Sequence, residues 1–260
     1  MDAAQRFHYA DFTYDNYRKL IRLAKQSYVF RTFDQFSPDE RFALWRHDVD
    51  LSMHAARNLA RIETDEGVAA TYLLQLHSEF YNLFDADVVD CVREIIAGGH
   101  RLGLHFDSHF YGIESADRLD EHLRRERDVI AGFFGQPVDV FSFHKTTPFT
   151  MSCRDWQYGG MINAYADYFQ TQVGYCSDSN GYWRHRRLED VLVAATDARL
   201  HVLTHDGWWQ AEAMSPRRRL LRCIEGRAAR TLHNYEKTMR TFDRLLIDDG
   251  EATRSDSAAA

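Results

Sequence analysis

The chain has 260 residues, 45% of them hydrophobic, and its 32 Lys and Arg against 39 Asp and Glu leave a formal net charge of −7. A domain of this length buries roughly three quarters of the surface that its unfolded chain exposes, so it folds without disulfides or a structural metal. The acidic balance gives no electrostatic basis for holding a nucleic-acid backbone, and we expect no nucleic-acid partner.

We expect neither an export signal nor a membrane-spanning segment in this chain. Its longest apolar runs are far shorter than the ~18 residues that cross a bilayer, and residues 1–8 lack the apolar stretch of a signal peptide. The four cysteines form no Cys-x-x-Cys pair, which favours free thiols. We therefore expect a cytoplasmic protein without a transmembrane segment. The sequence does not define its oligomeric state.

Hydrophobic spacing predicts alternating helices and strands. Residues 11–26 carry Tyr17, Leu20, Ile21 and Ala24 at helical spacing and predict an N-terminal helix. Strand and helix alternation favours right-handed crossovers and an α/β fold with mostly parallel strands, open or closed as a barrel. We expect one domain over residues 1–248 and a disordered tail of small and polar residues over 249–260. Strands are predicted at 42–47, 68–76, 101–105, 138–143, 174–177 and 200–205, and further helices at 52–66, 87–97, 115–134 and 216–245.

Two aspartates follow the first predicted strand. Side chains alternate along a strand, so Asp48 and Asp50 project to one side while Val49 turns away. Two carboxylates in one small space are costly unless a cation lies between them, one holds a proton, or water screens both. The alternative is that Asp50 and Ser52 cap the next helix.

Histidines follow two other predicted strands. His105 and His109 are four residues apart, a spacing that brings two imidazoles to one ion if the backbone turns helically after the strand. His205 ends a later strand. In parallel α/β folds such strand ends meet on one face. Two imidazoles and a carboxylate are the ligand set of a hydrolytic zinc-type site or of a non-haem iron site.

Four stretches of the chain form a recognisable combination of motifs. They are Arg-His-Asp-Val-Asp at 46–50, Ala-Thr-Tyr-Leu-Leu at 70–74, Gly-His-Arg-Leu-Gly-Leu-His at 99–105 and Leu-Thr-His-Asp-Gly-Trp-Trp at 203–209. In combination they resemble the NodB-like polysaccharide deacetylases, carbohydrate esterase family four, and look closest to the intracellular branch associated with surface-polysaccharide loci. The resemblance runs from about Phe42 to Trp209. It implies a distorted (β/α) barrel and metal-dependent hydrolysis of N-acetyl groups on amino sugars.

Carried over to this chain, the resemblance implies Asp48 as general base and His205 as general acid. It implies Asp50, His105 and His109 as ligands of a divalent metal ion, zinc first, with cobalt, manganese or iron as alternatives. In the commoner family form the aspartates are adjacent. Because Val49 separates them here, the base and ligand roles of Asp48 and Asp50 stay open to exchange.

Substrate contacts are expected from residues near these motifs. His144 or Lys145 stands where the family has an arginine that steadies the base, and Asp178 with Trp183 loosely matches its Asp-and-Trp motif. His77 is a candidate for substrate contact or a structural histidine. Trp208 is a candidate for stacking on a sugar ring or for packing.

These residues favour a metal-dependent amide hydrolase, an N-deacetylase of an amino sugar in surface-polysaccharide assembly. One alternative is a cyclic imide or ureide hydrolase on the same fold, and another is a catalytically inactive carbohydrate-binding relative. A third follows from His105-Phe-Asp107 and the distant His205, which spell the facial triad of iron oxygenases. That triad leaves Asp48 and Asp50 without a role.

Overall fold

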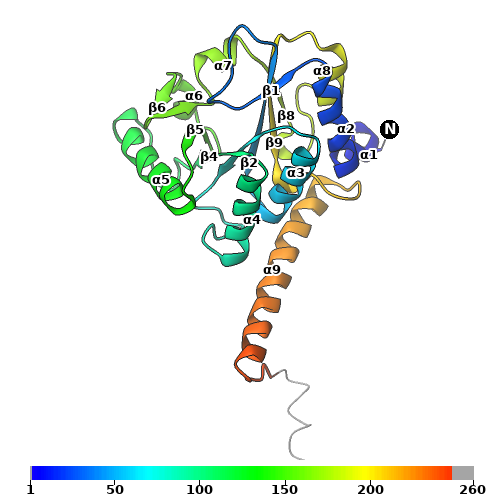
Figure 1. Ribbon diagram of the computed structural model, residues 1–260, viewed down its shortest axis with the longest axis vertical. Helices are drawn as coiled ribbons and strands as arrows, with labels where there is room; N and C mark the ends of the chain where they lie inside the picture. The colour runs from blue at the N-terminus through cyan, green and yellow to red at the C-terminus, as the bar shows by residue number, and fades with distance from the viewer. Residues whose placement is uncertain (1, 248–260) are drawn as a thin grey trace, which may run out of the picture.

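A computed structural model describes residues 2–247, so the tail predicted for residues 249–260 lies outside the described residues. Within that range the strands form a single nine-stranded sheet (Figure 1). They are β1 (Val29–Arg31), β2 (Phe42–Val49), β3 (Thr71–Leu74), β4 (Arg101–Phe106), β5 (Val138–Phe143), β6 (Gln157–Tyr158), β7 (Met161–Asn163), β8 (Gly174–Ser177) and β9 (Arg199–His205).

Helices connect the strands and pack on the sheet, except for α9, which extends away from the body (Figure 1). The α-helices are α1 (Ala3–Arg6), α2 (Tyr14–Lys25), α3 (Met53–Asp65), α4 (Ala86–Ala97), α5 (Leu119–Phe134), α6 (Pro148–Ser152), α7 (Asp167–Thr171), α8 (Leu188–Ala194) and α9 (Pro216–Thr241). Short 3-10 turns are η1 (Tyr9–Phe12), η2 (Ala116–Arg118), η3 (Ser179–Gly181) and η4 (Asp206–Trp208).

The strand order is β6-β7-β5-β4-β3-β2-β9-β8, with β1 beside the first half of β2. Every pairing is parallel except that of the short hairpin β6-β7. This confirms the α/β class with a mostly parallel sheet. Across residues 2–247 no pairing joins β6 to β8, so the curved sheet is not hydrogen-bonded into a closed ring.

The two faces of β2 lead to two separate cores. Ala43, Trp45 and Val49 belong to the large core, which also contains the buried residues of α2, α3 and α4. Phe42 and Leu44 point the other way, into a small core on the inner face of the sheet. Beyond them the inner-face positions become charged. The strand therefore carries apolar residues at its beginning and reactive ones at its carboxyl end.

The inner face has little room at β4, where the chain has a glycine. A Cβ added at Gly103 would lie 2.8 Å from Leu73 Cγ and 2.9 Å from the carbonyl oxygen of Val140. Any larger residue would push neighbouring strands apart beneath His105, two residues further along the same strand. Gly103 thus helps to set the position of the candidate site.

The predicted helices and strands appear within a few residues of their expected ends, whereas α1, β1, α8 and the elements between residues 144 and 173 were not predicted. That segment contains α6, β6, β7 and α7, each only two to five residues long. Elements of this length do not complete a helical or alternating pattern. Among residues 2–247, no helix combines the length and apolar composition needed to cross a bilayer.

Candidate metal centre and catalytic site

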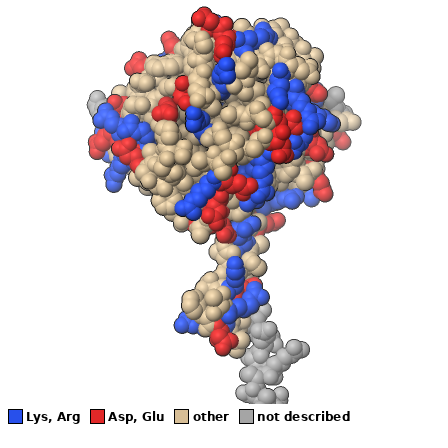
Figure 2. All heavy atoms as spheres, viewed as in Figure 1, with Lys and Arg blue, Asp and Glu red and all other residues tan. Residues whose placement is uncertain are grey.

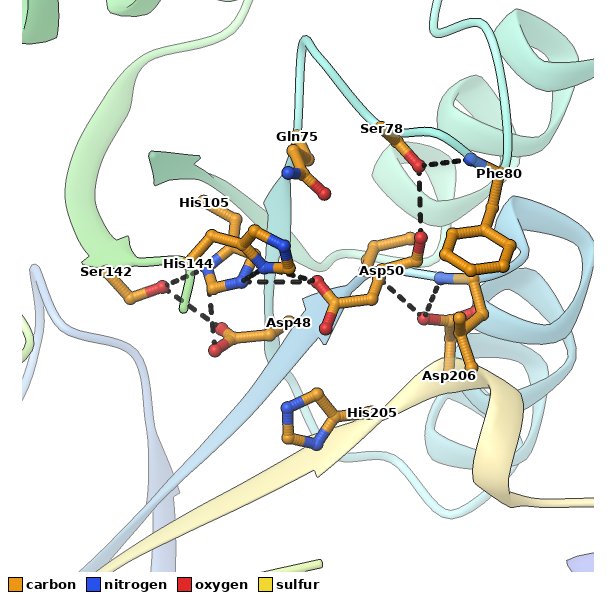
Figure 3. A network of polar contacts seen from close by, with 12 residues as sticks. Asp48, Asp50, Gln75, Ser78, Phe80, His105, Ser142, His144, His205 and Asp206 are labelled. Atoms are coloured by element: carbon orange, nitrogen blue, oxygen red, sulfur yellow. Dashed lines mark hydrogen bonds and ion pairs between the residues drawn. The ribbon is translucent and has the colours of Figure 1, made fainter. Parts of the chain in front are cut away.

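The strand register brings the predicted site residues to one edge of the sheet. Asp48 on β2 is paired with His205 on β9, and His105 on β4 is paired with Ser142 on β5. All of these residues lie near the carboxyl ends of their strands, where loops of a parallel sheet converge. Figure 3 shows their side chains turned toward one another above the sheet.

Asp50, His105 and His144 form the one group of potential metal ligands found in the described part of the chain. His105 Nε2 lies 3.0 Å from His144 Nδ1 and 3.2 Å from Asp50 Oδ1, and the latter two atoms are 3.4 Å apart (Figure 3). Four ligands at the ~2.0–2.1 Å bond lengths of zinc lie about 3.3–3.4 Å from one another in a tetrahedron. The three atoms therefore fit one face of a tetrahedral metal site.

A hydrogen-bond chain fixes the tautomer of His105. Ser142 Oγ donates to Asp48 Oδ1 over 3.2 Å, so its lone pair accepts the proton of His105 Nδ1, 2.6 Å away. The other ring nitrogen, Nε2, then carries a lone pair that faces Asp50 and His144. A neutral imidazole oriented in this way is the form that binds a divalent ion.

Asp48 is held by an arginine from its own strand. Arg46 Nε and Nη2 donate to the two oxygens of Asp48 over 2.8 and 2.7 Å, and both side chains are buried. Burial alone raises the pKa of a carboxyl, but the adjacent Arg46 guanidinium outweighs it and holds the pKa of Asp48 well below its usual range. Asp48 is thus a fixed anion directed at the centre.

His205 is paired with Asp178. Its Nδ1 lies 2.6 Å from Asp178 Oδ1, and Trp209 Nε1 donates to the other oxygen over 3.0 Å. Burial opposes protonation, but Asp178 and then the Asp50 and Asp48 carboxylates outweigh it and raise the pKa of His205 to about 9. The imidazole is therefore protonated at neutral pH, as a general acid requires.

The structure does not bring His109 to the metal-ligand group. After β4 the chain enters a turn in which Asp107 Oδ1 accepts the backbone N–H of His109, so the two histidines do not stack as on a helix. His109 is exposed, and its Nε2 contacts the carbonyl oxygen of Lys145 at 2.8 Å. His144, predicted to touch substrate or to steady the base, is the third member of the potential metal-ligand group instead.

The remaining predicted contact residues have structural partners. His77 Nε2 lies 3.0 Å from Glu126, and its ring stacks on Phe110. Trp183 Nε1 donates to Asp11 rather than joining Asp178. Trp208 is partly buried against the large core, and Lys145 presents its backbone carbonyl to His109. Of the predicted substrate-contact residues, only His144 and Asp178 lie in or beside the centre.

Asp206, next to His205, fastens the loop that carries Asp50. Its Oδ1 accepts the backbone N–H groups of Asp50 and Leu51 over 2.8 and 3.2 Å, and its Oδ2 accepts that of Ser52. Ser52 in turn caps α3 through its hydroxyl, which is the alternative role that the sequence left open for it. The carboxylate of Asp206 is fully buried. It therefore ties the end of β9 to the end of β2.

We expect Asp206→Asn to lower the free energy of unfolding by about 1–3 kcal/mol, because the amide nitrogen leaves a buried N–H without an acceptor. Denaturant unfolding measures this as a lower midpoint with an unchanged slope. Asp190→Asn, at an exposed position on α8, is the matched control. An unchanged midpoint in the Asp206 variant would show that the three contacts add nothing to stability.

Ser142→Ala should weaken metal binding about 10- to 100-fold, the usual effect of removing the hydrogen-bond partner of a ligand histidine. Without the hydroxyl, His105 loses the acceptor that holds its proton on Nδ1. Competition with a chelating dye measures the affinity. Ser152→Ala removes an exposed hydroxyl on α6 and should leave the affinity as it is. Equal affinities in both variants would contradict the hydrogen-bond chain.

Sequence reasoning missed the contacts of Arg46 and Ser142 with Asp48 and the place of His144 in the potential metal-ligand group. The signal was the alternation already used for Asp48 and Asp50. Extended back by two residues, it places Arg46 on the same side of β2. Applied to β5, it places Ser142 and His144 together on the inner face, beside His105. At the end of β2 and at the end of β5, the site residues therefore follow one another at every second position of the sequence.

No family model matches the chain, and no curated protein does. Among solved structures, the chain is similar to a CE4 esterase from Streptococcus mutans, with 15% identity over 83% of this chain and 90% of that one and a TM-score of 0.46. It is also similar to a peptidoglycan deacetylase from Bacillus subtilis, with 13% identity over 80% of this chain and 99% of that one and a TM-score of 0.43.

A third similar structure is a CE4 family pseudoenzyme from Bacillus anthracis, with 15% identity, 75% of this chain covered and a TM-score of 0.41. This chain spans 63% of the length of that one. Identities and scores of this size carry no argument about the reaction. The roles of individual residues therefore rest on the side-chain geometry.

Proposed function

We propose that the protein is a metal-dependent amide hydrolase, an N-deacetylase that acts on an amino sugar. The observation that carries the proposal is the meeting of Asp50, His105 and His144 at 3.0–3.4 Å, beside a carboxylate and a protonated histidine. We infer that these three residues hold the divalent ion, with His144 in place of His109. Zinc is our first choice, because a carboxylate and two imidazoles suit it.

When bound, a divalent ion supplies Lewis acidity, which polarises a carbonyl oxygen and lowers the pKa of a water from ~15.7 toward ~7. Asp50 serves as ligand and Asp48 as base, because Asp50 lies in the ligand group whereas Asp48 is paired with Arg46. The fixed carboxylate of Asp48 accepts the proton of the attacking water. Arg46 keeps that carboxylate ionised and in place.

His205 donates a proton to the leaving amine. Asp178 holds the imidazole by Nδ1, which leaves Nε2 free to transfer its proton. The side chains of Asp50, His144 and His205 keep 20%, 14% and 14% of their exposure, whereas those of Asp48 and Asp178 are buried. Solvent and substrate therefore reach Asp50, His144 and His205, while Asp178, which orients His205, is shielded from both.

The amino-sugar substrate and the link to surface-polysaccharide assembly rest on the resemblance of the four motif stretches to the NodB-like deacetylases. The N-acetyl group stays a prediction on the same ground. The cytoplasmic location and the single catalytic domain stay predictions from the composition and patterning of the sequence. The sugar carrier, whether a nucleotide, a lipid or a polymer, is left open by these motifs.

The test is acetate release by the purified full chain, stripped of metal and reloaded with zinc, cobalt or manganese. We expect release from N-acetylated amino-sugar oligosaccharides or nucleotide sugars with metal, and none after chelation or with Asp50→Ala. Turnover of cyclic imides but not of acetamido sugars would show that the protein is a cyclic imide hydrolase. Metal binding without turnover of any of these compounds would favour an inactive carbohydrate-binding protein.

A further inference from the structure

The long C-terminal helix α9 is fastened to the body along one side only. Arg219 is buried at its base, and its Nη1 donates to the carbonyl oxygen of Gly181 over 2.9 Å. Further along, Arg227 donates to the carbonyl oxygen of Glu79, and Asn234 donates to Asp87. These three side chains lie close to one line of the helix. The opposite side of α9 has no such contacts.

The exposed part of the helix and the residues that follow it carry many apolar side chains. Seven of the sixteen exposed large apolar side chains in residues 2–247 lie between 224 and 247. On the helix, Ile224, Leu232 and Tyr235 recur at helical spacing and are 45–55% exposed. We call the full set the C-terminal apolar surface. It consists of Ile224, Leu232, Tyr235, Phe242, Leu245, Leu246 and Ile247.

The same segment is strongly basic. Residues 216–247 contain nine Lys or Arg and three Asp or Glu, a net charge of +6 in a chain whose total is −7. Figure 2 shows basic side chains beside uncharged surface on the protruding part of the helix. The negative total of the whole chain therefore conceals one basic, amphipathic element. Basic residues on one face and Leu, Ile, Tyr and Phe on the other are typical of helices that lie in a membrane interface.

The helix also starts close to the candidate site. It begins eleven residues after His205, and it contacts η4, the turn that follows β9. Anything bound by α9 would therefore lie on the side of the molecule to which the carboxyl ends of the strands point.

We propose that the C-terminal apolar surface and the basic residues around it, Lys237, Arg240 and Arg244, bind the surface of an anionic lipid bilayer. Charge complementarity favours this occupant, because two such segments, each with an excess of Lys and Arg, repel when paired, whereas an anionic surface attracts each of them. The tip of the segment supports it as well. Leu245, Leu246 and Ile247 are consecutive and exposed, which suits insertion among acyl chains, whereas a paired helix seam uses only every third or fourth residue.

The test is flotation of the purified full chain with two kinds of vesicle, phosphatidylcholine alone and phosphatidylcholine with about one third phosphatidylglycerol. We expect binding to the anionic vesicles only, and weaker binding as added salt screens the charges. The triple variant Lys237→Gln, Arg240→Gln, Arg244→Gln should lose about a hundredfold in affinity, since each charge near such a surface contributes about fivefold. Tyr235→Ser and Phe242→Ser should each lose about tenfold.

Matched controls separate the surface from general effects of charge and hydrophobicity. Val193→Ser removes an apolar side chain that is 69% exposed on α8, and Arg93→Gln removes an exposed cation on α4. Both should bind vesicles like the parent chain, and all variants should keep the metal affinity of the parent. Absence of binding, or equal binding to neutral vesicles, would overturn the proposal. A second outcome would also overturn it. In that outcome, light scattering finds a dimer that Leu232→Glu converts to a monomer, and no variant floats with vesicles.

Discussion

His144→Ala should abolish high-affinity metal binding, with a loss well beyond the ~10–100-fold expected for an outer hydrogen-bond partner. His144 Nδ1 lies 3.0 Å from His105 Nε2 and 3.4 Å from Asp50 Oδ1, so its removal leaves two ligands where a hydrolytic centre needs three. Titration with a chelating dye measures the affinity, and elemental analysis of the purified variant measures the retained metal. Hydrolysis should fall together with the metal content.

The matched control is His109→Ala, because the resemblance to known deacetylases and the structure disagree about this residue. His109 is exposed and contacts only the Lys145 carbonyl oxygen through its ring, so the variant should retain metal and fold normally. The opposite pattern, with metal lost from the His109 variant and kept by the His144 variant, would restore the ligand pair expected from the sequence. It would also require the turn after β4 to rearrange.

His205→Ala should retain metal and lose turnover by about a hundredfold to ten-thousandfold, the usual contribution of positioned proton transfer. His205 is held by Asp178 and is not among the three ligands, so the variant separates catalysis from metal binding. The change should appear mainly in kcat, because proton donation acts in the transition state. Undiminished turnover would remove the acid assignment.

The pH profile gives an independent readout of the same pair. An acid must be protonated, so activity should fall as the pH rises through the His205 pKa of about 9. Asp178→Asn removes the main charge that raises this pKa, and the alkaline limb should then move toward lower pH. The pairing of His205 with Asp178 also stabilises the folded protein, and this contribution decreases with rising pH, as the activity does. It is present below the unfolded histidine value of ~6.5 and is lost as the pH rises through about 9. An unshifted limb would show that Asp178 does not act through His205.

The alternation of helices and strands was predictable because each main element completes a helical or alternating pattern. The inner and outer faces of β2 are an example. Phe42 and Leu44 enter one core and Ala43 and Trp45 the other, as strand alternation requires. The same rule placed the two site aspartates on one side, and both contact His105 in the structure.

The third metal ligand was not predictable from spacing alone. A four-residue spacing aligns His105 with His109 only on a helix, and Asp107 initiates a turn in its place. His144 lies 39 residues from His105, and only the pairing of β4 with β5 brings the two together. Such contacts depend on the register between strands, which a single sequence without structure does not define.

The most direct measurement is anomalous diffraction from crystals of the full chain loaded with zinc and recorded on both sides of the zinc edge. We predict one strong peak, about 2.0–2.2 Å from Asp50 Oδ1, His105 Nε2 and His144 Nδ1, with Asp48 still paired to Arg46. A peak bound to His109 in place of His144, or no peak near Asp50 in fully loaded crystals, would contradict the proposed centre.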